Sequence, residues 1–99
     1  MDNDMYSLRV LSHGEITDLS EDFSLKGRPF SIFVRPKKLQ SSLETSILLE
    51  CKCICDKHSS NLPVPVGDWT PAAIVSIKKE AIDLSEFSVF WGAGEIIKN

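Results

Sequence analysis

Apolar and polar residues alternate along much of this chain, and this period of two constrains the fold more than any other feature. In the run PFSIFVR, Phe30, Ile32 and Val34 fall on one side of an extended chain, and Phe33 falls on the other. A β-strand has this repeat because its successive side chains point to opposite faces. No convincing long amphipathic helix competes with the pattern, so the sequence predicts a β-rich domain.

Short alternating segments recur between turn signals, which is typical of a sandwich or a barrel. The fold class that we predict is therefore all-β, as a small antiparallel β-sandwich or a partly open barrel. We expect His13-Gly14 to end the first strand, and Gly92 and Gly94 to end the last. The expected strands cover residues 5–11, 29–35, 45–57, 62–66, 72–80 and 87–91.

The segment AAIVSIKKE fits two kinds of secondary structure. The spacing of Ala73 and Ile77 suits a helix, whereas the alternation through Val75 suits a strand. The β-branched residues Ile74, Val75 and Ile77 favour the strand, because branching at Cβ fits a pleated sheet better than a helix. An α+β fold with one short helix near residues 71–82 is the alternative.

Two prolines mark an edge of the predicted sheet. Pro63 and Pro65 stand two apart in LPVPV, so both missing N–H donors lie on the same side of the strand. That side cannot pair with a neighbouring strand, whereas the other side can. We therefore expect either an edge strand or a strand-like lead into the turn around Trp69.

Cys51, Cys53 and Cys55 occupy every second position of LLECKCICDKHSS, and we interpret them as one wall of the core. Together with Ile47 and Leu49 they fall on one face of a strand, and free cysteine behaves as a small buried hydrophobe. Disulfides among them are disfavoured, because Cα atoms two residues apart on a strand are about 6.5–7 Å apart and the side chains run parallel.

A zinc site is the alternative interpretation of the cysteines. Structural zinc sites usually have two to four residues between paired cysteines, and this run has one. Cys53, Cys55 and His58 would converge only if the chain bends near Asp56, with His13 as a fourth ligand. We therefore predict no metal site and no cofactor.

The composition is that of one ordinary folded domain. The chain has 99 residues, of which 42% are apolar and 25% are charged, so we expect a single domain over 1–99 with a short polar N-terminal segment. The net charge of −3 argues against nucleic acid or an anionic membrane as the main partner. The acidic start does not resemble a signal peptide, and the odd cysteine count fits a reducing cytoplasm.

No catalytic motif occurs in the sequence. His13 and His58 are the only histidines, and neither belongs to a nucleophile signature. The Gly92-x-Gly94 pair lacks the third glycine and the following helix of a dinucleotide-binding loop. We therefore predict a protein that is not an enzyme and has no catalytic residues.

Aromatic residues occur on both faces of two predicted strands. In FSVFW, Phe90 falls opposite to Phe87 and Trp91, and Phe33 repeats the pattern. Large aromatic side chains on the second face of a sheet indicate that a loop or another subunit covers that face. The contact residues that we predict are Phe33, Trp69, Phe90 and Trp91, with Pro63 and Pro65 shaping an edge.

The segment LPVPVGDWTPAAIVSIKKE resembles the C-terminal half of small virion structural proteins of tailed bacteriophages. Those proteins tend to have a V-P-V-like strand, a turn, and a strand with the pattern P…IV. Residues 63–67 match the first part, and Pro71, Ile74 and Val75 match the last. The segment GRPFSIFVRP is also similar in placement to a strand of that family, whereas the cysteine-rich strand and AIDLSEF depart from it.

The resemblance implies a head-decoration, head-fibre or tail-accessory subunit that has no catalytic residues and works as a homo-oligomer on the particle. The expected partners are copies of the chain in a dimer or trimer, and other virion proteins such as the major capsid protein. The expected location is the virion, after synthesis in the host cytoplasm. The alternative is a small cytoplasmic adaptor or inhibitor module with one protein partner.

Overall fold

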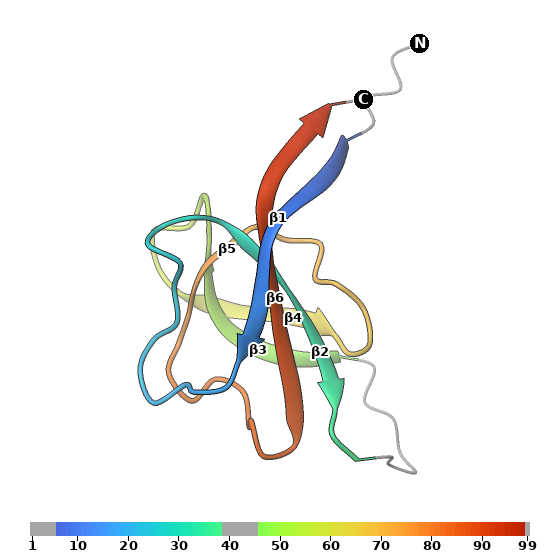
Figure 1. Ribbon diagram of the computed structural model, residues 1–99. Helices are drawn as coiled ribbons and strands as arrows, with labels where there is room; N and C mark the ends of the chain where they lie inside the picture. Colours follow the sequence, from blue (N-terminus) through green and yellow to red (C-terminus); the bar gives the residue numbers. More distant parts are fainter. Residues whose placement is uncertain (1–5, 39–45, 99) are drawn as a thin grey trace.

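The computed structural model describes residues 6–38 and 46–98, and it confirms the predicted all-β fold. One antiparallel sheet contains all six strands, in the order β1-β6-β2-β5-β3-β4 (Figure 1). The predicted polar N-terminal segment and position 45 lie outside the described residues. The strands are β1 (Tyr6–Ile16), β2 (Phe30–Pro36), β3 (Ser46–Cys53), β4 (Ser60–Pro65), β5 (Ile74–Ile77) and β6 (Phe87–Lys98).

The segment near 71–82 forms strand β5 and turns, so the alternative α+β fold with a helix there is wrong. Against β3, Ser76 pairs with Lys52 and Ile74 pairs with Cys53, so Val75 is an extra residue in a bulge. The bulge allows Ile74 and Ile77, three positions apart, to be buried together. Residues three positions apart also share one face of a helix, which explains why this segment fitted both a helix and a strand.

The sheet curls, so that the segment following the edge strand β4 returns to bond with β2. The chain leaving β4 forms a parallel bridge between Val66 and Val34, and Gly67 donates its backbone N–H to the Val34 carbonyl at 2.7 Å. Thr70 donates to the Ile32 carbonyl at 2.9 Å. Strand β2 is therefore bonded to β6 on one side and to β5 and the 66–70 segment on the other, as in a partly open barrel.

The core fills the inside of this curled sheet. Its members come from every strand, and the fully buried ones lie on β2 to β6. Burying an aliphatic side chain of this size stabilises the fold by about 1.5–3 kcal/mol. The aliphatic side chains with 0% exposure are those of Ile32, Val34, Leu49, Val64, Ile74, Ile77 and Val89.

Strands β1 and β6 are longer than predicted, because the glycines expected to end them are inside the strands. A Cβ atom on Gly14 would lie 2.8 Å from Nε1 of Trp91, so the glycine leaves room for that indole ring. A Cβ atom on Gly94 would overlap the backbone carbonyl of Arg9. Gly94 therefore permits close approach of the two paired strands at the bulge around Leu11.

The far ends of β1 and β6 form a two-stranded ribbon that projects from the rest of the sheet (Figure 1). The pairing continues to Tyr6 and Lys98, and the molecule measures 44 Å along its longest axis against 30 and 24 Å along the others. Arg9 and Glu95 form an exposed ion pair across the ribbon at 3.7 Å. Such exposed pairs contribute little stability.

Strand β4 is at the edge of the sheet, as the two prolines predicted. It pairs with β3, with Pro63 opposite Leu48 and Pro65 opposite Ser46. Residues two apart on a strand direct their backbone groups to the same side, so both prolines direct their missing donors away from β3.

Candidate functional site

Three of the predicted contact residues form an aromatic patch on the outer face of the sheet. Phe33 pairs with Phe90 across β2 and β6, and it forms a bridge with Trp69 on its other side. The rings of Phe33 and Trp69 are edge-to-face, with centroids 5.5 Å apart. The guanidinium carbon of Arg35 lies 5.9 Å from the centroid of Phe90. We call Phe33, Trp69 and Phe90 the outer aromatic patch.

The outer aromatic patch is covered only in part. The segment that follows β4 brings Trp69 against Phe33, and both Phe33 and Phe90 are half-buried. Trp69 itself remains 46% exposed. The Trp69 side chain that packs on Phe33 is thus itself an exposed aromatic surface.

The other three predicted contact residues lie elsewhere. Trp91 is on the opposite face of β6, where its half-buried ring packs against the core and beside Gly14. Pro63 and Pro65 are on the edge strand β4. The structure therefore groups Phe33, Trp69 and Phe90, and separates them from Trp91 and from the prolines.

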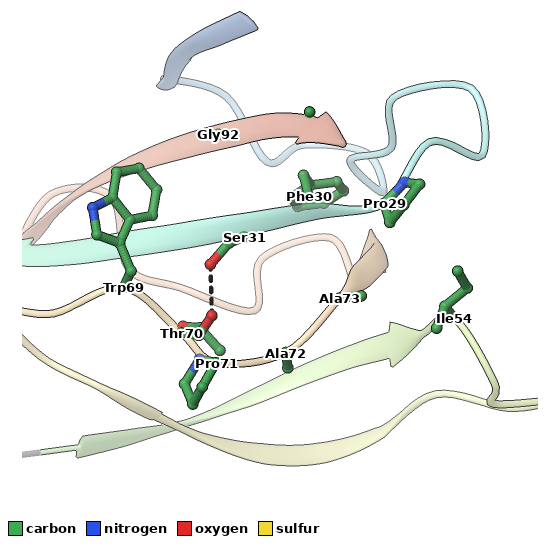
Figure 2. A pocket seen from close by; sticks show the side chains of 11 residues that line it. Pro29, Phe30, Ser31, Ile54, Trp69, Thr70, Pro71, Ala72, Ala73 and Gly92 are labelled. Carbon is green, nitrogen blue, oxygen red and sulfur yellow. Dashed lines mark hydrogen bonds between the residues drawn. The ribbon is translucent and has the colours of Figure 1, made fainter. Parts of the chain in front are cut away.

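A cleft of about 580 Å³ adjoins Trp69 (Figure 2). Its depth arises on the outer face, where Ser31 of β2 pairs with Gly92 of β6 and neither residue has a large side chain. Figure 2 shows Trp69 at one end of the cleft and Ile54 at the other. The lining residues are Pro29, Phe30, Ser31, Ile54, Trp69, Thr70, Pro71, Ala72, Ala73, Gly92 and Gly94.

Hydrogen bonds from β2 hold the wall of the cleft that residues 69–73 form. The Ser31 hydroxyl donates to the Thr70 carbonyl at 2.6 Å, and this bond is drawn in Figure 2. The backbone of Thr70 is bonded in turn to Ile32. The Thr70 hydroxyl is buried and, in the part of the chain that the structure describes, has no hydrogen-bond partner.

The cleft is suited to binding an apolar group. None of its lining residues has an ionisable side chain, and the Ser31 hydroxyl is already used as a donor within the fold. General acid–base or nucleophilic chemistry needs a base or an activated nucleophile at the site. These residues supply apolar surface and the aromatic side chains of Phe30 and Trp69, which are means of recognition.

Sequence reasoning identified Trp69 but did not find the cleft. Ser31, Ala72 and Gly92 are far apart in the chain, and each has an ordinary local explanation as a strand or turn residue. The only local signal is that small residues interrupt the aromatic outer faces of β2 and β6. That signal becomes a cleft only when the register between the two strands is known.

The cysteines are divided between the core and the surface. Cys51 is buried in the core, Cys53 packs against it, and all three cysteines are free, as predicted. Strand β3 ends at Cys53, however, so the prediction that Cys55 lies in the core wall is wrong. A turn closed by Asp56, which accepts a hydrogen bond from the Cys53 N–H at 3.0 Å, leaves Cys55 exposed.

Burial changes the acidity of two thiols. It raises the pKa of Cys51 to about 12, with a smaller contribution from neighbouring Cys53. Burial also raises the pKa of Cys53, and the nearby charge of Asp56 adds to the increase. Both thiols are therefore protonated and weakly nucleophilic at neutral pH.

The proposed alternative ligands Cys53, Cys55 and His58 are not gathered into a metal site. No group of three or more His, Cys, Asp or Glu side chains within residues 6–38 and 46–98 is placed to hold a metal ion. His13 and His58 are both exposed.

Asp18 and Asp83 organise two turns. Asp18 accepts hydrogen bonds from the backbone and hydroxyl of Ser20, which lower its pKa. Asp83 accepts corresponding bonds from Ser85, again with a lowered pKa. These carboxylates are exposed, and their hydrogen bonds account for their acidity without a role in binding.

Comparison with known proteins found no matching family model, no matching curated protein and no matching solved structure. In the described ranges, no helix has the length and hydropathy needed to cross a membrane.

Proposed function

We propose that this chain is a non-enzymatic structural subunit, which associates with copies of itself and docks on a larger assembly. The observation that carries the proposal is the apolar surface formed by the outer aromatic patch and the adjoining cleft. Trp69 belongs to both, is 46% exposed, and lies beside lining residues that have no ionisable group. Partly exposed aromatic side chains around an apolar hollow are typical of surfaces that bind another protein.

The resemblance of residues 63–75 to small virion proteins of tailed bacteriophages supports a particle as the setting. In that setting the subunit is a dimer or trimer that decorates a head or tail and contacts the major capsid protein or another virion protein. The net charge of −3 supports a protein partner over nucleic acid or an anionic membrane. A cytoplasmic adaptor with a single partner would use the same surface as a monomer.

The oligomeric mass of the purified chain tests the proposal. Sedimentation velocity should give a dimer or trimer of the 11.0 kDa chain, and Trp69→Ala should shift the population to monomer, because Trp69 belongs to both the patch and the cleft. Leu11→Ala is the control, because Leu11 is 58% exposed and lies outside the patch. A wild-type chain that stays monomeric, or a Trp69→Ala variant that assembles normally while remaining folded, would contradict the proposal.

A further inference from the structure

Strands β3 and β4 carry a small apolar projection on their outer face. Leu48 is 66% exposed, and its partner across the two strands is Pro63, which is also exposed. Directly opposed residues of an antiparallel pair lie on the same face, so the two side chains are neighbours. We call Leu48 and Pro63 the knob.

The knob and the cleft hold most of the large apolar side chains that are described as exposed. Among the residues whose side-chain burial is described, these are Leu11, Leu48, Ile54 and Trp69. Leu48 belongs to the knob, whereas Ile54 and Trp69 line the cleft. The molecule therefore presents an exposed apolar pair and an apolar cleft, and they share no residue.

The cleft is large enough to receive the knob. The floor of the cleft at Ser31 and Gly92 has no large side chain, and its volume of about 580 Å³ leaves room for a branched side chain beside a proline ring. Aromatic walls such as that of Trp69 are the surfaces on which proline rings commonly pack.

The two surfaces also match in polarity. Neither has an ionisable side chain, so their contact would bury no charge. Pro63 has no backbone N–H, so the outer edge of β4 has a carbonyl acceptor at this position but no donor. Burial of this edge would therefore leave no N–H group without a hydrogen-bond partner there.

We propose that the knob of one copy occupies the cleft of a second copy. This inference rests on the proposed function, because it names the contact through which the copies associate. The contact joins two different surfaces of the same chain. It is either reciprocated about a two-fold axis in a dimer or repeated from copy to copy in a ring or a filament.

Two complementary variants test this contact. Leu48→Glu places a carboxylate on the knob and leaves the cleft intact, whereas Ala72→Glu places one in the cleft and leaves the knob intact. Leu11→Glu is the matched control, because it introduces the same charge at an exposed leucine outside both surfaces. Circular dichroism melting of each variant establishes that it is folded before its mass is compared.

We expect Leu48→Glu and Ala72→Glu to sediment as monomers when alone, and Leu11→Glu to assemble like the wild type. An equimolar mixture of the first two should give a species of twice the 11.0 kDa chain mass, because one functional knob meets one functional cleft. Assembly should stop there, since the dimer has no second complementary pair.

Three outcomes would overturn the inference. A wild-type chain that is monomeric would remove the inference and the proposed function together. Folded Leu48→Glu or Ala72→Glu protein that assembles normally would remove only the inference, since the copies would then associate through another surface. Variants that are monomeric both alone and when mixed would also overturn it, because the knob and the cleft would then meet surfaces other than each other.

Discussion

A Cβ atom at Gly94 would overlap the carbonyl group of Arg9 on the neighbouring strand. The obstacle is backbone, which cannot move without disturbing the pairing of β1 and β6. We expect Gly94→Ala to lower the free energy of unfolding by about 1–3 kcal/mol, the usual cost of overpacking. Urea denaturation at equilibrium measures this change.

Gly14→Ala is the comparison for Gly94→Ala. There the added Cβ atom would meet the indole ring of Trp91, whose nearest atom lies at 2.8 Å. A side chain can rotate away more readily than backbone, so the loss of stability at Gly14 should be the smaller one. An equal or larger loss at Gly14 would show that the close backbone approach at Gly94 is not what limits the ribbon.

The Cys51 thiol should make stability depend on alkaline pH. Its pKa is raised from 9.0 to about 12 by burial, so the folded chain keeps the proton after the unfolded chain has lost it. The thiol's contribution to stability is therefore complete below pH 9.0 and is lost as the pH rises through 12. Urea denaturation over this range should give a shallower decline for Cys51→Ala than for the wild type.

Cys55→Ser is the control for the alkaline titration. Cys55 lies in the exposed turn after β3, so its replacement should leave the slope of stability against pH unchanged. If Cys51→Ala and the wild type lose stability in parallel between pH 9 and 12, burial of Cys51 does not contribute to the pH dependence.

Strand β3 separates core and surface within two adjacent residues. Leu49 has 0% exposure and Leu48 has 66%, so the same substitution tests both faces. We expect Leu49→Ala to cost about 2–5 kcal/mol of unfolding free energy, and Leu48→Ala to stay within about 0.5 kcal/mol. Denaturation midpoints of the two variants measure the difference, and similar losses would mean that the register of β3 is wrong.

The strands that the sequence predicted well are those with unbroken alternation. In β2 the predicted core residues Phe30, Ile32 and Val34 are all buried, because nothing interrupts the period of two. In β5 the bulge at Val75 breaks that period, and the local pattern then fits a helix as well as a strand. An extra residue in a ladder is determined by the partner strand, so it cannot be read from one segment.

Glycines account for the errors in the predicted ends of strands. Gly92 and Gly94 have the local character of strand ends, yet β6 continues through both to Lys98. The reason is nonlocal, because the space that the glycines leave is occupied by a neighbouring strand or forms the floor of the cleft. The aromatic patch, by contrast, was predictable from local pattern, since alternation alone places Phe33 and Phe90 on the outer faces.

Across the whole molecule, stability should be lowest in the projecting ribbon. Its residues pair only with each other, and an isolated two-stranded ribbon is marginally stable in water. We therefore expect the amides of the ribbon, near Arg9 and Glu95, to exchange with solvent faster than those of Ile32 to Val34 in the bonded centre. Hydrogen exchange followed by NMR tests this order, and equal protection in isolated monomer would contradict it.

The order of the strands in the sheet could not be predicted from the sequence. About six strands were expected and the described residues form six, but their order depends on contacts between distant segments. The cleft depends on that order too, because it needs Ser31 beside Gly92 and the 69–73 segment beside both. Local patterns determine which segments are strands, whereas the complementarity of whole faces determines which strands are neighbours.

The central position of β6 also has a consequence for synthesis on the ribosome. Among the six strands β6 is translated last, yet it lies between β1 and β2 in the sheet. Until it emerges, β1 has no partner strand among the described residues, and β2 has only a short pairing with β5 and the bonds to the 66–70 segment. Folding must therefore wait until translation has passed β6, and nascent chains arrested before residue 87 would expose the core faces of their strands to chaperones and proteases.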